Sequence, residues 1–176
     1  RYVYQCAKCG KQSDEPEPDP AWLFLTQPLR AFCEECRPTI KLHPSRKCPY
    51  DADYFLRGKQ TGRSLYEIYH WMPELTVPMV MAMVDHLGIK WNHSILDFGC
   101  ARGYVVKAFR ELGYTAYGVD VSEWAINNAD EATKPYLHLT SDMSPLRPLE
   151  FDWVIAKDVL EHVTDAADMV TVLMES

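Results

Sequence analysis

The sequence contains no long apolar run and no signal-peptide pattern. None of its hydrophobic stretches approaches the roughly 20 residues that a helix needs to cross a bilayer, and its first residues lack the apolar core of a secretory signal. These absences argue against a membrane or exported protein, so we expect a cytoplasmic one with no membrane partner. With 176 residues, 47% of them hydrophobic, the chain can bury the core of one ordinary domain and carry a small appendage.

Basic residues are scarce in the second part of the chain. Residues 51–176 carry ten Lys and Arg against nineteen Asp and Glu, whereas residues 1–50 carry eight against six. A broad nucleic-acid interface needs clustered positive charge, so the acidic part disfavours one there. The same acidity suits a cationic ligand, although a solvated acidic surface also explains it.

The most informative stretch begins at Ser94. Residues 94–98 form a short apolar run typical of a buried strand, and the glycines of residues 99–103 break it with a tight turn. Residues 105–112 then have helical spacing, so backbone amides of the turn are expected to face a ligand at a helix N-terminus. A second strand over residues 115–119 ends at Asp120, where a carboxylate can bind both hydroxyls of a ribose. The pattern predicts a ribose-bearing cofactor.

The positions of the glycines decide which cofactor is favoured. A dinucleotide fingerprint needs glycine at positions 99, 101 and 104, but the chain has Gly99, Ala101 and Tyr104, with its last glycine at Gly103. Asp97 would also place a carboxylate beside a pyrophosphate, which is electrostatically unfavourable. A cofactor that carries a sulfonium and an ammonium group suits this acid better than a nicotinamide or flavin dinucleotide.

Three motifs in register resemble the class I S-adenosylmethionine-dependent methyltransferases. They are DFGCARG at 97–103, GVDVS at 118–122 and DWVIAKDVLEHV at 152–163. The family's first motif is an acid followed by Gly-x-Gly-x-Gly, and this chain departs from it by one alanine. The resemblance covers roughly residues 50–176 and implies an α/β, Rossmann-like sheet. Its first four strands would lie in the order 3-2-1-4, and the family's last three strands have no counterpart up to Ser176, so we expect the core to be incomplete at its C-terminus.

The resemblance also implies roles for single residues. Asp120 would hold the ribose, the turn would meet the methionine part, and Asp142 with Met143 would frame the adenine. His162 is the candidate general base toward an acceptor hydroxyl, since imidazole exchanges protons readily near neutral pH, but a scaffold role for the Glu-His-Val sequence is the alternative. The expected cofactor-binding residues are Asp97, Gly99, Ala101, Gly103, Asp120, Val121, Asp142, Met143 and Lys157.

The N-terminal part contains two CxxC pairs separated by 23 residues. This spacing is close to that of four-cysteine zinc sites, in which four thiolates close a tetrahedral shell and leave no position for water. We therefore expect a structural zinc ribbon in residues 1–48, before a methyltransferase core in residues 49–176; two disulfides or a redox pair are the alternatives. The predicted zinc ligands are Cys6, Cys9, Cys33 and Cys36.

Further elements are predicted along the core. The aromatic rings of Tyr54 and Phe55 are expected either to fold over the cofactor or to pack against the core. Spacing predicts a short helix over Leu65–Trp71 and a longer one over Val77–Leu87, with Pro78 in its first turn. Later elements are a helix from Ser122, strands over 136–139 and 151–156, and a helix over 165–175.

The methyl acceptor is the least defined part of this interpretation. Zinc modules precede such cores in ribosomal RNA guanine methyltransferases and in deoxysugar C-methyltransferases, so the resemblance allows RNA or a small molecule. The acidic core favours a small molecule, such as a sugar or another metabolite, as the partner. The alternative is a non-catalytic protein in which the zinc ribbon docks a partner and the cofactor-binding core is a relict.

Overall fold

The computed structural model describes residues 48–140, 151–163 and 165–174, together with the backbone of four short strands that precede them. Those strands form two antiparallel pairs: β1 (Tyr4–Gln5) with β2 (Gln12–Ser13), and β3 (Leu23–Thr26) with β4 (Leu29–Phe32). No helix of the described part has both the length and the apolar character to cross a membrane. The remaining elements are α1 (Ala52–Leu56), α2 (Gly58–Thr61), α3 (Pro73–Leu87), β5 (Ser94–Phe98), α4 (Tyr104–Glu111), β6 (Thr115–Asp120), α5 (Glu123–Asn127), η1 (Lys134–Tyr136), β7 (Leu137–Leu139), β8 (Trp153–Ile155), η3 (Leu160–His162) and α6 (Ala166–Met174).

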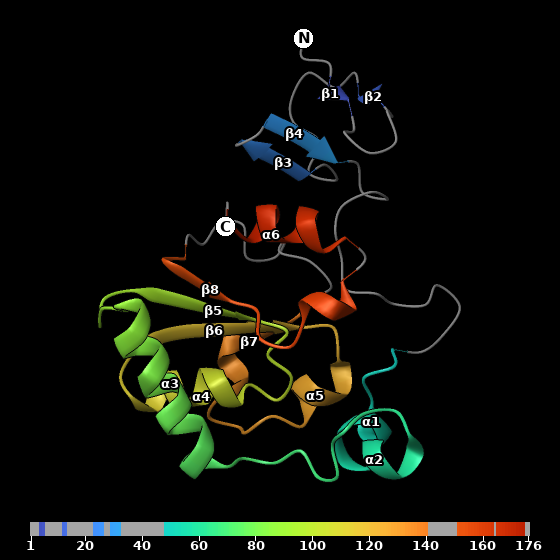
Figure 1. The fold of residues 1–176 in the computed structure, drawn as a ribbon, viewed down its shortest axis with the longest axis vertical. Coiled ribbons are helices and arrows are strands. Elements are labelled where there is room, and N and C mark those ends of the chain that lie inside the picture. Colours follow the sequence, from blue (N-terminus) through green and yellow to red (C-terminus); the bar gives the residue numbers. More distant parts are fainter. Residues whose placement is uncertain are drawn as a thin grey trace.

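The central sheet has four strands in the order β7-β6-β5-β8, and all neighbours are parallel (Figure 1). In chain order this is 3-2-1-4, which confirms the predicted Rossmann-like α/β class. The register places Asp97 opposite Gly118 and Asp120 opposite Leu139. The carboxyl ends of β5 and β6 therefore meet at one edge of the sheet, where ligands of open α/β folds bind.

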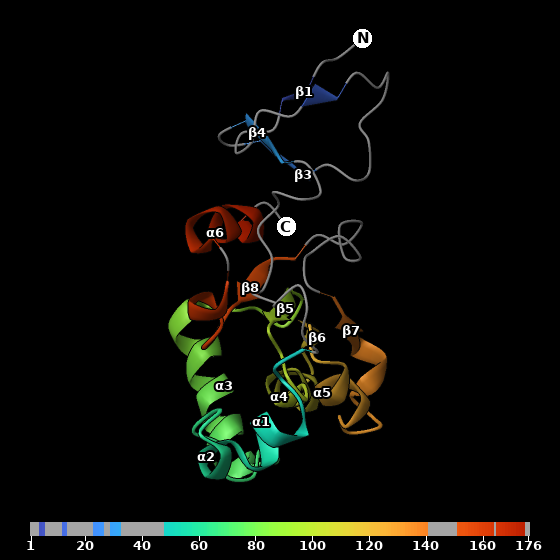
Figure 2. The ribbon, with the colours of Figure 1, turned by 90° about the vertical axis from the view of Figure 1, so that its right-hand side faces the viewer.

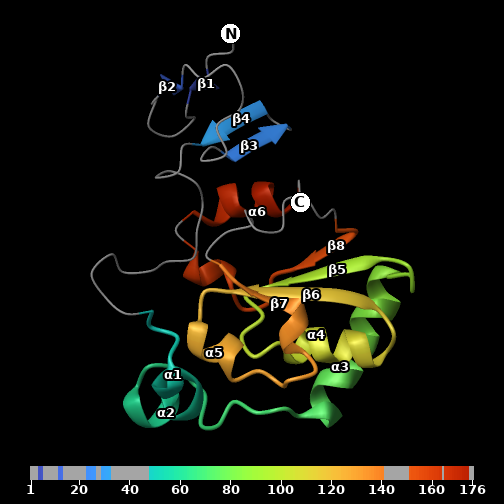
Figure 3. The same ribbon diagram turned by 180° about the vertical axis from the view of Figure 1, so that it is seen from behind.

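Helices cover both faces of the sheet. Alternate residues of the strands face opposite sides, so Leu96 and Val119 pack toward α6, whereas Ile95 and Ala116 pack toward α3 and α4. The ribbon views agree that α6 lies on one side of the sheet and α3, α4 and α5 on the other (Figures 1 and 3). Asp97 and Asp120 share the alternation of Ile95 and Ala116 and so project to the side of α4.

The segment before the sheet differs most from expectation. The predicted helix over Leu65–Trp71 is wrong, because those residues form irregular chain whose backbone bonds back to α1 and α2. The amide of Tyr69 donates to the Phe55 carbonyl at 2.9 Å, and the amide of Lys59 donates to the Tyr66 carbonyl at 2.8 Å. Tertiary hydrogen bonds therefore replace the local bonds that a helix would need.

Helix α3 begins earlier than predicted. It starts at Pro73 instead of Val77, so Pro73 takes the first-turn position and Pro78 lies inside the helix. Its end is as predicted, since Gly88 caps it in the left-handed conformation at φ 68°. Helix α5 also begins as expected, with the Ser122 hydroxyl accepting from the amide of Ala125 at 3.0 Å.

Candidate cofactor site

The turn between β5 and α4 is folded tightly against β6. The amides of Gly99 and Cys100 both donate to the carbonyl of Val119, at 2.8 and 2.9 Å. Gly99 has φ 82°, and a Cβ there would overlap the side chain of Val159. Glycine is therefore required at this position by backbone conformation and by space.

The amides of the turn are already bonded within the protein. Those of Gly99 and Cys100 are taken by β6, the Gly103 amide donates to the Cys100 carbonyl at 2.8 Å, and the Ala101 amide donates to Asp120 Oδ2 at 2.7 Å. The expectation that the turn presents free amides to a ligand is therefore wrong for these four groups. The turn meets a ligand through its surface and through the carboxylates that it positions.

Two buried carboxylates stand at the ends of neighbouring strands. Asp97 is 5% exposed and Asp120 is 7% exposed. Asp120 accepts from the amides of Ala101 and Ser122, each at 2.7 Å. Burial is the largest influence on both groups: it raises the pKa of Asp120 against these hydrogen bonds, and it raises the pKa of Asp97 to about 7, with the charge of Asp120 adding to the effect and Lys157 opposing it.

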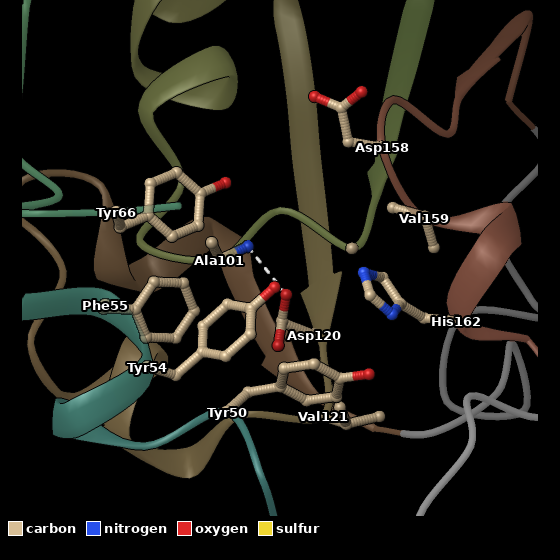
Figure 4. Close-up of a pocket in the computed structure, with 11 residues that line it drawn as sticks. Tyr50, Tyr54, Phe55, Tyr66, Ala101, Asp120, Val121, Asp158, Val159 and His162 are labelled. Carbon is tan, nitrogen blue, oxygen red and sulfur yellow. Dashed lines mark hydrogen bonds between the residues drawn. The ribbon is translucent and has the colours of Figure 1, made fainter. Parts of the chain in front are cut away.

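A cavity opens beside these strand ends (Figure 4). Its empty space is about 460 Å³, counting the part that opens to solvent. Its lining comes from the segment before the sheet, from the turn, from the end of β6 and from the loop after β8. The lining residues are Tyr50, Tyr54, Phe55, Tyr66, Gly99, Ala101, Asp120, Val121, Asp158, Val159 and His162.

One wall consists of aromatic side chains from the segment of residues 50–71. We call this whole segment the aromatic cover. In Figure 4 the hydroxyl of Tyr54 points toward Asp120, and Phe55 and Tyr66 lie beside it. Phe55 is buried and stacks on Trp124 of α5, with ring centroids 5.5 Å apart. Tyr54 and Phe55 both line the cavity, and Phe55 also packs against the core; that the two rings fold over a cofactor stays a prediction.

The opposite wall follows β8. Asp158 has φ 56° and forms an ion pair with Lys157, and His162 of η3 turns its ring toward the cavity (Figure 4). The rings of His162 and Tyr50 meet edge to face, with centroids 5.5 Å apart. Within the described part of the chain, the two non-glycine residues with positive φ are Ala101 and Asp158, and both line this cavity. Strained backbone of this kind is concentrated at functional sites.

The predicted site residues fall into three groups. Gly99, Ala101, Asp120, Val121 and His162 line the cavity together. Three predicted residues are near lining residues in the sequence but do not line the cavity themselves. Asp97 is buried, Gly103 caps α4, and Lys157 is paired with Asp158. Asp142 and Met143 lie outside the described residues, as do the four cysteines Cys6, Cys9, Cys33 and Cys36.

Sequence reasoning missed Tyr66 as a lining residue. The segment around Tyr66 has apparent helical spacing, which does not predict that its ring faces the turn between β5 and α4. Tertiary hydrogen bonds place the ring there, and such bonds leave no local pattern in the sequence. Among the described residues, no group of three or more His, Cys, Asp or Glu side chains is arranged to hold a metal ion.

A parallel sheet with a strained turn, two acidic strand ends and an adjoining cavity is typical of open α/β domains, in which ligands bind at the carboxyl ends of the strands. Residues 57–173, about two thirds of the chain, match the family described as a methyltransferase domain. The chain therefore belongs to this methyltransferase family.

Its curated relatives include two quinone-pathway enzymes. The ubiquinone biosynthesis O-methyltransferase of Thiobacillus denitrificans is 31% identical over 100 residues, which cover 53% of this chain and 43% of that protein. The mitochondrial ubiquinone biosynthesis O-methyltransferase of Schizosaccharomyces pombe is 34% identical over 90 residues, covering 46% and 32%. The matched part thus spans less than half the length of these relatives.

Solved structures with a similar fold include two methyltransferases. The magnesium protoporphyrin IX methyltransferase of Synechocystis PCC 6803, solved with bound SAM, is 26% identical with a TM-score of 0.44, covering 56% of this chain and 51% of that one. A putative methyltransferase from an antibiotic biosynthesis pathway of Anabaena variabilis is 19% identical with a TM-score of 0.47, covering 56% and 40%.

Proposed function

We propose that the protein transfers a methyl group from S-adenosylmethionine to a small-molecule acceptor. The observation that carries this proposal is the pair of buried carboxylates, Asp97 and Asp120, beside a cavity walled by tyrosine and phenylalanine rings. S-adenosylmethionine supplies a methyl group on a positively charged sulfur and also bears an ammonium group. Acidic groups and aromatic faces are the surroundings that favour such a cation.

The chemistry of the two carboxylates fits this ligand. The carboxylate of Asp120 accepts the amide of Ala101 on one oxygen and the amide of Ser122 on the other, and each carboxylate oxygen has two lone pairs, so Asp120 is proposed to accept the ribose hydroxyls as well. Burial and the nearby charge of Asp120 raise the pKa of the Asp97 carboxyl, and no hydrogen bond to a described residue opposes this effect. An ammonium group nearby would compensate it. In this proposal Asp142 and Met143 frame the adenine, and Lys157 acts through its neighbour Asp158.

The acceptor side is proposed to use His162. Its ring reaches the cavity and is held edge-on by Tyr50, so it is placed to take the proton that an acceptor hydroxyl loses. The names of the relatives favour an oxygen atom as the site of methylation. Residues 51–176 carry ten Lys and Arg against nineteen Asp and Glu, and this acidity supports a small uncharged or cationic acceptor over RNA. An RNA acceptor would instead bind with a steep dependence on salt concentration.

Calorimetry with S-adenosylmethionine and with its demethylated product tests the cofactor site. We expect wild type to bind both, and Asp120→Asn to bind at least tenfold more weakly, because an amide presents one acceptor where the carboxylate presents two. Asp130→Asn is the matched control, since Asp130 is an exposed aspartate whose carboxylate pairs with Lys107 at 2.8 Å. If the zinc-loaded wild-type protein bound neither compound, the enzyme hypothesis would be rejected in favour of a non-catalytic interaction protein with a relict core.

We also propose a structural zinc ion in the N-terminal module, whose extent to residue 48 follows from the same pattern. The support is the spacing of the two CxxC pairs, and the four thiolates of Cys6, Cys9, Cys33 and Cys36 would hold the ion. Metal analysis of the purified protein should then give one zinc per chain, and Cys33→Ser should lose it. Cys48→Ser is the control, because the thiol of Cys48 contacts the Val121 carbonyl at 3.6 Å. Retention of zinc by Cys33→Ser would contradict this site.

A further inference from the structure

Arg102 lies in the middle of the cofactor turn, yet its side chain bonds to two distant segments. Its Nε donates to the carbonyl of Asn128, which follows α5, at 2.7 Å. Its Nη1 donates to the carbonyl of Tyr69, in the aromatic cover, at 3.0 Å. One guanidinium therefore joins three parts of the chain: the turn, the end of α5 and the cover.

Aromatic rings surround the same guanidinium. Its central carbon lies 5.4 Å from the ring centroid of Tyr104 and 6.0 Å from that of Trp124. These rings also continue into the cover, because Tyr69 packs on Tyr104 at 5.1 Å and Phe55 stacks on Trp124 at 5.5 Å. Contacts of this kind orient the planar guanidinium and stabilise its positive charge.

The bond to Tyr69 reaches the cavity wall in one further step. The amide of Tyr69 donates to the Phe55 carbonyl at 2.9 Å, and Phe55 lines the cavity beside Tyr54. Figure 2 shows α1 and α2 on the side of the sheet that carries α4 and α5. Of the hydrogen bonds that join the cover to the core, Arg102 supplies the one that comes from the turn itself, to the Tyr69 carbonyl.

We propose that Arg102 is a positioning residue that holds the aromatic cover over the cofactor turn and thereby sets the affinity for the cofactor. This inference rests on the proposed function, because it assumes that the cavity binds S-adenosylmethionine. Arg102 is outside the cavity lining and acts through Tyr69 and Phe55. Its fork of donors is needed, because a lysine ammonium cannot reach two carbonyls and stack on two rings in one geometry.

Arg110 provides a matched control within the same region. It is partly buried, donates to the Ala116 carbonyl at 3.0 Å and lies over the ring of Tyr136 at 3.2 Å. Its contacts resemble those of Arg102 in kind, but they join α4 to β6 and η1 instead of joining the turn to the cover. Loss of Arg110 should cost stability without releasing the cover.

Hydrogen exchange and calorimetry on the full zinc-loaded chain test the inference. In Arg102→Met we expect amides of residues 52–70 to exchange at least tenfold faster than in wild type, and S-adenosylhomocysteine to bind at least tenfold more weakly. Arg110→Met should change either quantity less than threefold. Arg102→Lys should fall between wild type and Arg102→Met, and it replaces that variant if the methionine protein fails to fold.

The outcomes separate the two levels of the proposal. Unchanged exchange of residues 52–70 in the Arg102 variants would overturn the inference, and so would equal effects of the Arg110 variant. Faster exchange with unchanged affinity would reduce Arg102 to a structural role and also overturn it. If wild type did not bind S-adenosylhomocysteine, the proposed function would fail, and exchange alone would decide whether Arg102 holds the cover.

Discussion

Asp97 is expected to make the protein less stable as the pH rises toward neutrality. Burial raises the pKa of its carboxyl from the usual value near 3.8 to about 7, so the folded state holds this proton more tightly than the unfolded chain does. Raising the pH therefore removes stability between about pH 4 and pH 7, and the loss is complete above the folded-state pKa. Each tenfold change in proton affinity corresponds to ~1.4 kcal/mol, so the full loss is up to ~4 kcal/mol.

The substitution Asp97→Asn should remove the part of this dependence that comes from Asp97. An asparagine does not titrate, so the free energy of unfolding of the variant should change less than that of wild type between pH 5.5 and 8.5. The buried amide has its own cost of ~1–3 kcal/mol, but that cost is the same at every pH in the range. The slope with pH, and not the level, is therefore the quantity to compare.

Urea unfolding at a series of pH values, with zinc present throughout, measures that slope. Some dependence should remain in the variant, since burial also raises the pKa of Asp120. Asp152→Asn is the control: the hydrogen bonds from Ser94 lower the pKa of this exposed carboxyl, so its titration lies below the tested range. The reasoning would be refuted if Asp97→Asn kept the wild-type slope, or if wild type lost no stability between pH 5.5 and 7.

Three further results are expected. Binding of S-adenosylmethionine near pH 7 should release a fraction of a proton, because a cation lowers the pKa of Asp97; calorimetry in buffers of different ionisation enthalpy measures it, and Asp97→Asn should release none. Ala101→Gly should leave the free energy of unfolding within ~1 kcal/mol of wild type, because relief of the backbone strain at φ 51° offsets the entropy that the unfolded chain gains. Ala108→Gly, inside α4, should lower the free energy of unfolding by at least ~1 kcal/mol, and equal losses in the two variants would contradict this. Gly99→Ala should lower the free energy of unfolding, measured with urea, by ~3 kcal/mol or more, and Gly113→Ala should lower it by ~1 kcal/mol. Both glycines have positive φ, but a Cβ at Gly99 would overlap Val159, whereas a Cβ at Gly113 would meet open space.

The sheet could be predicted because its signals are local. Residues 94–98 and 115–119 are short apolar runs with a glycine turn and a helical pattern between them, and a right-handed parallel crossover follows from that order. The acid at the end of each strand is fixed by the same register. The sequence thus predicts that Asp97 and Asp120 lie at the ends of neighbouring strands.

The aromatic cover could not be predicted, because long-range contacts determine its conformation. The irregular chain around Tyr66 and Tyr69 is held by bonds to α1, α2 and Arg102, and none of these partners lies at helical spacing. The start of α3 was predicted four residues too late. Pro73 and Pro78 both suit the first turn of a helix, and the helix begins at Pro73.

The bonding of the turn amides was a second failure of local reasoning. A glycine turn before a helix usually leaves amides free for a ligand, but here the Val119 carbonyl and the Asp120 carboxylate accept three of them. Close approach of the turn to β6 allows this, because Gly118 offers no side chain to hold the turn away. The pairing of β5 with β6 brings these acceptors to the turn, and a local sequence pattern does not show that they take the amides from a ligand.

The parallel sheet also implies an order of assembly for the cavity. The wall made by β5, the turn and β6 comes from residues 94–120, a span short enough to form early, and Asp120 locks it by accepting from Ala101. The wall that carries Asp158 and His162 arrives with β8, whose pairing with β5 joins positions 58 residues apart, as between Ser94 and Asp152. Contacts between distant residues form slowly, so the half that carries Asp120 should be built before the half that carries Asp158 and His162.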